Sequence, residues 1–116
     1  MQYLLLIYEP EAAYADADEA ALTEIVGKHM ALSEALRAEG VLRGGDGLEG
    51  VRAATTVVTG LGGEQFVHDG PFAETKEQLG GYYAIEVADL DAALAVARRV
   101  PVIAGGKVEV RPVMTY

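Results

Sequence analysis

The pattern of hydrophobic and polar residues in the first third of the chain predicts a strand followed by a long amphipathic helix. Tyr3–Tyr8 is apolar at every position, which is typical of a strand buried on both faces. Asp16–Glu39 repeats apolar residues at helical spacing, and Gly40 is a natural stop for this helix. Either Asp16 or Asp18 is expected to cap its start. The apolar face of the helix is expected to comprise Leu22, Ile25, Val26, His29, Leu32, Ser33 and Leu36.

The middle of the chain predicts a β-hairpin. The glycine-rich stretch Val41–Leu48 follows the first helix and returns the chain to the sheet. Two short runs with strand composition come next, Thr55–Thr59 and Glu64–His68, and the loop Gly60–Gly63 joins them. This hairpin is an addition to the alternation of strands and helices on either side of it.

The last third of the chain repeats the order of the first. Ala73–Leu79 has the composition of one or two helical turns, and Gly81–Val87 is predicted to be a strand. Asp89 is expected to cap a second helix that Pro101 ends, because proline cannot continue a helix. Lys107–Val113 is predicted to be the last strand. The inward face of the second helix is expected to comprise Leu90, Ala93, Leu94 and Ala97.

This order predicts an α+β protein with a ferredoxin-like split βαβ arrangement and an extra hairpin. The 116 residues are expected to form a single domain, residues 1–116, with an antiparallel sheet covered by two helices on one face. Two helices cover only one face of such a sheet, whereas Tyr3–Tyr8 is apolar on both. We therefore favour a homodimer with sheets face to face, and keep as the alternative a sheet that curls over itself.

Composition excludes several classes of function. A net charge of −9 leaves no basic stripe for nucleic acid and disfavours anionic membranes. The absence of cysteine excludes disulfides and thiolate metal sites, and two histidines are too few for a His-rich metal site. We expect neither a metal nor a tightly bound cofactor. No apolar run approaches the roughly 20 residues that span a bilayer, and the start lacks signal-peptide features, so a cytoplasmic location is expected.

The segment DGPFAETKEQLGGYY predicts a rigid corner. Asp69 can form an Asx turn, Gly70 permits unusual backbone angles, Pro71 fixes the next angle, and Phe72 has a ring to bury. Rigid loops on a scaffold often carry binding groups. The alternative is that Asp69 only caps the turn and that the charges which follow it are solvated.

This segment, with the opening YLLLIYE and the ending VEVRPV, resembles the DGPF-motif branch of the YCII-related family. The resemblance covers nearly the whole chain and implies a ferredoxin-like subunit in a dimeric α+β barrel. It also implies an enzyme-like cleft holding a histidine and an aspartate, and a setting beside extracytoplasmic-function sigma factors in stress signalling. His68 departs from the small polar residue common before the motif. His68 and Asp69 are neighbours in sequence but need not touch, because adjacent strand residues face opposite sides.

His29 and Asp69 are the candidate catalytic residues. A histidine on an apolar helix face must satisfy its polar atoms or line a cavity, and Asp69 would orient the imidazole for acid–base work. The alternative is a core histidine bonded to a carbonyl or water. Lys76 and Arg111 could bind an anionic group, or form surface ion pairs instead. The candidate ligand-binding residues are Tyr8, Phe72, Lys76, Tyr82 and Arg111.

Two functions from different classes fit the sequence. The first is a small-molecule enzyme that uses a His-Asp acid/base pair in a cleft of a homodimer. The second is a non-catalytic ligand-binding or regulatory module linked to sigma-factor or stress signalling. Cofactor-free oxygenation has only fold analogy behind it, and a fold does not fix a function.

Overall fold

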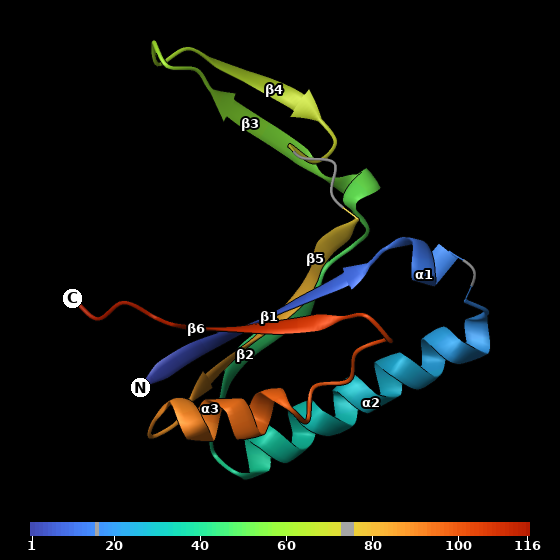
Figure 1. The fold of residues 1–116 in the computed structure, drawn as a ribbon, viewed down its shortest axis with the longest axis vertical. Coiled ribbons are helices and arrows are strands. Elements are labelled where there is room, and N and C mark those ends of the chain that lie inside the picture. Colours follow the sequence, from blue (N-terminus) through green and yellow to red (C-terminus); the bar gives the residue numbers. More distant parts are fainter. Residues whose placement is uncertain (16, 73–75) are drawn as a thin grey trace.

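The chain folds into a four-stranded antiparallel sheet covered on one face by helices, with a two-stranded ribbon projecting from one end (Figure 1). The computed structural model describes residues 1–15, 17–72 and 76–116. The sheet has the strand order β2-β5-β1-β6, which confirms the predicted ferredoxin-like α+β fold. Its strands are β1 (Gln2–Pro10), β2 (Leu42–Gly47), β5 (Glu77–Glu86) and β6 (Lys107–Pro112), and its covering helices are α2 (Glu19–Ala38) and α3 (Leu90–Ala97).

The central strand β1 alternates between a buried and a half-buried face. Tyr3, Leu5 and Ile7 are buried beneath the helices. Leu4, Leu6 and Tyr8 point to the opposite face and are half-buried within one chain. The prediction of burial on both faces thus holds for the helix side only. The core comprises Tyr3, Leu5, Ile7, Leu32, Leu36, Tyr83, Ile85, Ala93, Val96 and Val100.

Helix α2 packs on the sheet through its C-terminal half. Asp18 is its N-cap and accepts a hydrogen bond from the Ala21 amide at 2.8 Å, while the other candidate cap, Asp16, lies outside the described residues. Leu32 and Leu36 are buried, whereas the predicted inward residues of the N-terminal half, Leu22 and Val26, are exposed. The prediction fails there because this half of the helix borders a cavity.

The end of α2 and its short neighbour follow local signals. Gly40 has a φ of 77° just beyond the helix, a backbone angle that favours glycine and confirms the predicted stop. A four-residue helix, α1 (Ala12–Ala15), precedes α2 and was not predicted.

Helix α3 presents a different face from the one predicted. Asp89 caps it as expected, accepting a hydrogen bond from the Ala92 amide at 2.9 Å. Ala93 and Val96 are buried, but the predicted inward residues Leu90 and Leu94 are exposed. The helix is only eight residues long, so its contact with the sheet uses the small face around Ala93 and not the leucines.

Strand β5 starts earlier than predicted. The expected helical turn at Ala73–Leu79 is wrong for Glu77–Leu79, which is the start of β5, and 73–75 lie outside the described residues. Glu77, Gln78 and Leu79 pair with the end of β1, with a register shift between Ile7 and Tyr8. Backbone pairing with a neighbouring strand overrides the local helical composition here.

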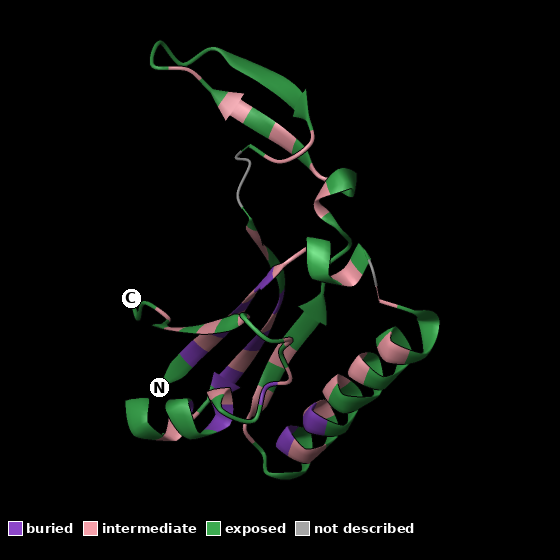
Figure 2. Cartoon of the chain, turned by 45° about the vertical axis from the view of Figure 1, so that its right-hand side comes forward, coloured by how far each residue is buried: buried purple, intermediate pink, exposed green. Residues whose placement is uncertain are grey.

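The predicted hairpin forms the projecting ribbon, which we call the arm (residues 55–69). Its strands are β3 (Thr55–Thr59) and β4 (Gln65–Asp69), and a single 3₁₀ turn, η1 (Val51–Ala53), lies at its base. The arm points away from the sheet and helices, and no residue in it is buried (Figures 1 and 2).

Candidate functional site

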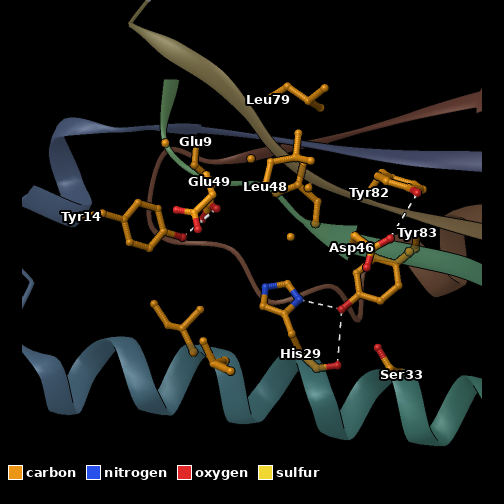
Figure 3. Close-up of a pocket in the computed structure, with 18 of the residues that line it drawn as sticks. Glu9, Tyr14, His29, Ser33, Asp46, Leu48, Glu49, Leu79, Tyr82 and Tyr83 are labelled. Carbon is orange, nitrogen blue, oxygen red and sulfur yellow. Dashed lines mark hydrogen bonds between the residues drawn. The ribbon is translucent and has the colours of Figure 1, made fainter. Parts of the chain in front are cut away.

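A cavity of about 990 Å³ lies between the N-terminal half of α2 and the sheet (Figure 3). A volume of this size accommodates a small organic molecule. Its upper wall comes from β5 and from the segment after β2, and α2 forms the opposite wall. The apolar side chains around it include Leu22, Ile25, Val26, Met30, Leu48 and Leu79.

His29 and Tyr83 form a hydrogen-bonded pair inside this cavity. His29 Nδ1 and the Tyr83 hydroxyl oxygen are 2.6 Å apart, and the rings stack with centroids 5.9 Å apart (Figure 3). The same hydroxyl lies 3.4 Å from the carbonyl oxygen of His29 and can donate to it. Helix α2 supplies the histidine and β5 supplies the tyrosine, so helix packing on the sheet sets the distance between them.

Burial changes the proton affinity of both members of the pair. Burial lowers the pKa of His29, while the charge of Glu9 and the Pro101 carbonyl oppose that change. Burial raises the pKa of Tyr83, and a hydrogen bond with Ser33 opposes that rise. At neutral pH the pair is therefore a neutral imidazole bonded to a neutral phenol.

Glu9 and Tyr14 form a second polar pair in the cavity. The Tyr14 hydroxyl donates to Glu9 Oε1 at 2.7 Å, and the Ile103 amide donates to Glu9 Oε2 at 2.8 Å. Glu9 is only 8% exposed, so both carboxylate oxygens are satisfied away from bulk water. Burial and the adjacent carboxylate raise the pKa of Tyr14, which keeps its hydroxyl protonated as a donor.

The charged residues around the cavity are mainly acidic. Arg37 is the basic residue among those that line it in the described part of the chain. Against it stand five carboxylates, which favour neutral or cationic ligands over anions. They belong to Glu9, Glu11, Glu34, Asp46 and Glu49.

The structure separates His29 from Asp69 within one chain. Asp69 ends β4, pairs with Thr55 across the arm, and is not among the residues that line the cavity. Phe72, also expected at the pocket, is 84% exposed and lies outside it as well. A His29-Asp69 pair therefore stays a prediction, and it would require Asp69 from a second copy.

The remaining predicted ligand residues divide between the cavity and the surface. Tyr82 borders the cavity, and its hydroxyl is 3.4 Å from Asp46 Oδ2. Tyr8 lines a separate shallow hollow beside β6. Lys76 is exposed, and Arg111 is exposed with its Nε 3.9 Å from Glu109 Oε1.

Sequence reasoning found His29 but missed Glu9, Tyr14 and the role of Tyr83. One signal for Glu9 was present, because the alternation Tyr3, Leu5, Ile7 continues to position 9 and places its carboxylate on the helix side. No local signal identifies Tyr83 as the partner of His29, since 54 positions separate them.

Neither a metal-binding cluster nor a membrane-spanning helix is present in the described residues. They contain no group of three or more histidine, aspartate or glutamate side chains able to hold a metal ion. Within residues 1–15, 17–72 and 76–116, no helix is long and apolar enough to cross a membrane.

Comparison with known proteins gives a match to the YCII-related domain over residues 1–116. An uncharacterized protein of Rhizobium meliloti (strain 1021) is 54% identical over 56 residues, which are 47% of this chain and 45% of that protein. The matched part is thus less than half of the relative's own length. Because the domain match extends over residues 1–116, the chain belongs to the YCII-related domain family.

Proposed function

We propose that the cavity binds a small organic molecule and that the His29–Tyr83 pair transfers a proton to or from it. The 2.6 Å hydrogen bond between His29 and Tyr83 inside a cavity of about 990 Å³ carries this proposal. General acid–base catalysis needs a titratable group that a bound substrate can reach, and a histidine at an open cavity is such a group.

The chemistry follows from the two pKa directions. A lowered pKa leaves the imidazole of His29 neutral at pH 7, with its Nδ1 bonded to the Tyr83 hydroxyl. A substrate proton can therefore pass to the hydroxyl oxygen of Tyr83 as that hydroxyl gives its own proton to Nδ1. Tyr83 stays a phenol because burial raises its pKa, and its hydroxyl holds the imidazole in place. The negative charge of Glu9 favours protonated His29, so it stabilises the imidazolium that forms during the reaction.

The shape and charge of the cavity support an amphiphilic substrate. The cavity combines apolar side chains of α2 with charged residues that are mainly acidic, which suits a neutral or amine-bearing molecule with an apolar body. Lys76 and Arg111, the cations expected to bind an anion, lie outside this cavity. We further propose that the protein acts in the cytoplasm as a homodimer and belongs to the DGPF branch of the family, a proposal that the segment DGPFAETKEQLGGYY supports.

Ligand charge can be tested with benzylamine and benzoate, two probes of similar shape and opposite charge. Each is titrated into ¹⁵N-labelled protein while amide shifts are followed by NMR. Benzylamine is expected to shift the signals of Tyr14, His29 and Tyr83, whereas benzoate leaves them in place. Stronger shifts with benzoate would contradict an acidic cavity, and the absence of any shift here with a wider panel of amines would contradict a binding site.

Acid–base function needs a separate readout. The imidazole signals of His29 are followed against pH with and without benzylamine, in the wild type and in Tyr83→Phe. We expect the apparent pKa of His29 to change on ligand binding in the wild type and to start from a different value in Tyr83→Phe. A bound probe that leaves the titration of His29 unchanged would favour the non-catalytic ligand-binding or regulatory module, linked to sigma-factor or stress signalling.

A further inference from the structure

The arm exposes apolar side chains on both of its faces. Val57 pairs with Val67 on one face, and Val58 pairs with Phe66 on the other. Phe66 is 56% exposed and Val67 is 69% exposed. A two-stranded hairpin with no packed face is marginally stable in water, so this ribbon requires a surface to pack against.

The cavity presents a matching apolar surface that nothing in the described part of its own chain covers. Five large apolar side chains around its mouth are exposed, and we call them the cavity rim. Three of them lie on α2, and the other two come from the residue after β2 and from β5. The cavity rim comprises Leu22, Val26, Met30, Leu48 and Leu79.

The total surface of the chain is too large for a compact monomer. The chain exposes 8111 Å², whereas a folded monomer of 12.2 kDa exposes about 6,100 Å² by the usual scaling with mass. The excess of about 2,000 Å² is more than twice the roughly 800 Å² that each partner buries in a standard interface. The radius of gyration, 16.1 Å, likewise exceeds the about 13 Å expected for this length.

We infer that the arm of a second copy of this chain packs over the cavity rim and closes the site. A second copy is the occupant because both unpartnered surfaces, the arm and the rim, belong to one chain and can exchange around a two-fold axis. A dimer that made contact only through its two sheet faces would leave the arm and the cavity rim exposed. An exchange of arms would bury these two surfaces as well. In its own chain the arm points away from the sheet and from α2, which line the cavity (Figure 1).

The exchange gives the site a residue that one chain does not bring to it. Strand β4 carries Phe66, which would roof the cavity, and ends at Asp69, which is exposed in its own chain. Asp69 of one protomer then approaches His29 of the other, which would form the predicted pair. The catalytic consequence rests on the proposed function, but the packing of the arm does not.

Photo-cross-linking tests the packing without any ligand. Phe66 is replaced by benzoylphenylalanine in ¹⁵N-labelled protein, which is mixed with unlabelled wild type, irradiated and analysed by mass spectrometry. We expect cross-links that join labelled β4 to unlabelled peptides of α2 or of 48–51. The same probe at Leu90, exposed on α3, is the matched control and should not reach these peptides. Cross-links confined to one isotope, or links from Phe66 to the opposite sheet face, would overturn the inference.

Introducing a charge into the apolar contact provides the second measurement. Phe66→Lys places an ammonium group where the arm would meet the rim, and because Phe66 is exposed, the rest of the fold should be unaffected. We expect sedimentation equilibrium to give at least about a tenfold weaker dimer, while Leu90→Lys retains wild-type affinity. Equal dimer affinity in both variants, or a wild type that is monomeric at micromolar concentration, refutes the arm exchange. Neither result depends on whether His29 transfers protons.

Discussion

Glu9 shows how a buried charge is made tolerable by donors from distant parts of the chain. Its carboxylate accepts one hydrogen bond from Tyr14, just after β1, and one from the amide of Ile103, before β6. A buried carboxylate without such donors would cost several kcal/mol in desolvation. Glu9 thereby ties the end of β1 to the loop before β6, and its charge acts on His29.

Removing the Tyr14 hydroxyl should reveal the strength of this tie. Tyr14→Phe leaves Glu9 Oε1 without its donor in a site that is 8% exposed, so we expect a loss of about 1–3 kcal/mol in the free energy of unfolding. Urea denaturation at pH 7 measures it. Tyr82→Phe is the control, because its exposed contact to Asp46 at 3.4 Å should contribute less than about 0.5 kcal/mol. Equal losses in the two variants would contradict the role given to Glu9.

The lowered pKa of His29 makes stability depend on pH in a defined direction. Above its ordinary pKa of 6.5 the ring is neutral in both the folded and the unfolded state. As the pH falls below that value, the unfolded chain takes up the proton first, so the folded state loses stability until the lower folded pKa is reached. The loss of folding stability therefore begins near pH 6.5 and continues toward more acidic pH.

Substitution of His29 should flatten this part of the stability curve. Urea denaturation of the wild type and of His29→Gln measures the free energy of unfolding at a series of pH values, from about pH 7.5 down through the range in which His29 takes up its proton. We expect the wild type to lose more stability than His29→Gln over that range. A wild type that gains stability on acidification relative to His29→Gln would reverse the assigned sign.

Among the elements, the pairing of β2 with β5 depends on a close backbone approach. Gly45 lies opposite Tyr83, and a Cβ at Gly45 would stand 2.7 Å from the carbonyl oxygen of Tyr82. The neighbouring Gly44 has open space where its Cβ would be. Gly45 is therefore a position of this glycine-rich strand at which a side chain would not fit. Its lack of a side chain lets β2 pair closely with β5, the strand that carries Tyr83.

The two glycines give a matched pair of variants. Gly45→Ala should destabilise the protein by about 1–3 kcal/mol, because its methyl group meets backbone that cannot move independently. Gly44→Ala should change stability by less than about 1 kcal/mol. Denaturant unfolding of both variants provides the comparison. If Gly44→Ala is the more damaging of the two, the register of β2 against β5 is wrong.

For the whole molecule, the half-buried face of the sheet bears on assembly. Leu4, Leu6 and Tyr8 of β1 share this face with Tyr82 and Ala84 of β5, and the described helices lie on the opposite side. Apolar surface of this kind is usually covered by a partner. The homodimer stays a prediction from the sequence, and so does the use of this face as its contact.

Dimerisation should make thermal stability depend on protein concentration. If the native state is a dimer and the unfolded state a monomer, mass action raises the unfolding midpoint as concentration rises. Calorimetry over at least a tenfold concentration range tests this, and Phe66→Lys should show the dependence at a lower midpoint. A midpoint independent of concentration, with a monomer mass by sedimentation, would exclude the dimer.

The sequence determined the elements whose signals are local. Alternating apolar residues, the caps Asp18 and Asp89, the stop at Gly40 and the hairpin loop each act within a few residues, so they are readable without the fold. The order of these elements then sufficed for the ferredoxin-like sheet. Local composition failed at Glu77–Leu79 because pairing with β1 outweighs it.

Tertiary structure alone decided the site. His29 was identifiable as an unusual histidine on an apolar face, but its partner Tyr83 is 54 positions away and reaches it only through the packing of α2 on β5. The sequence also could not show that α2 leaves its N-terminal half over a cavity, or that Asp69 lies on an arm remote from His29. Contacts between distant segments depend on strand register and helix placement, which are properties of the assembled chain.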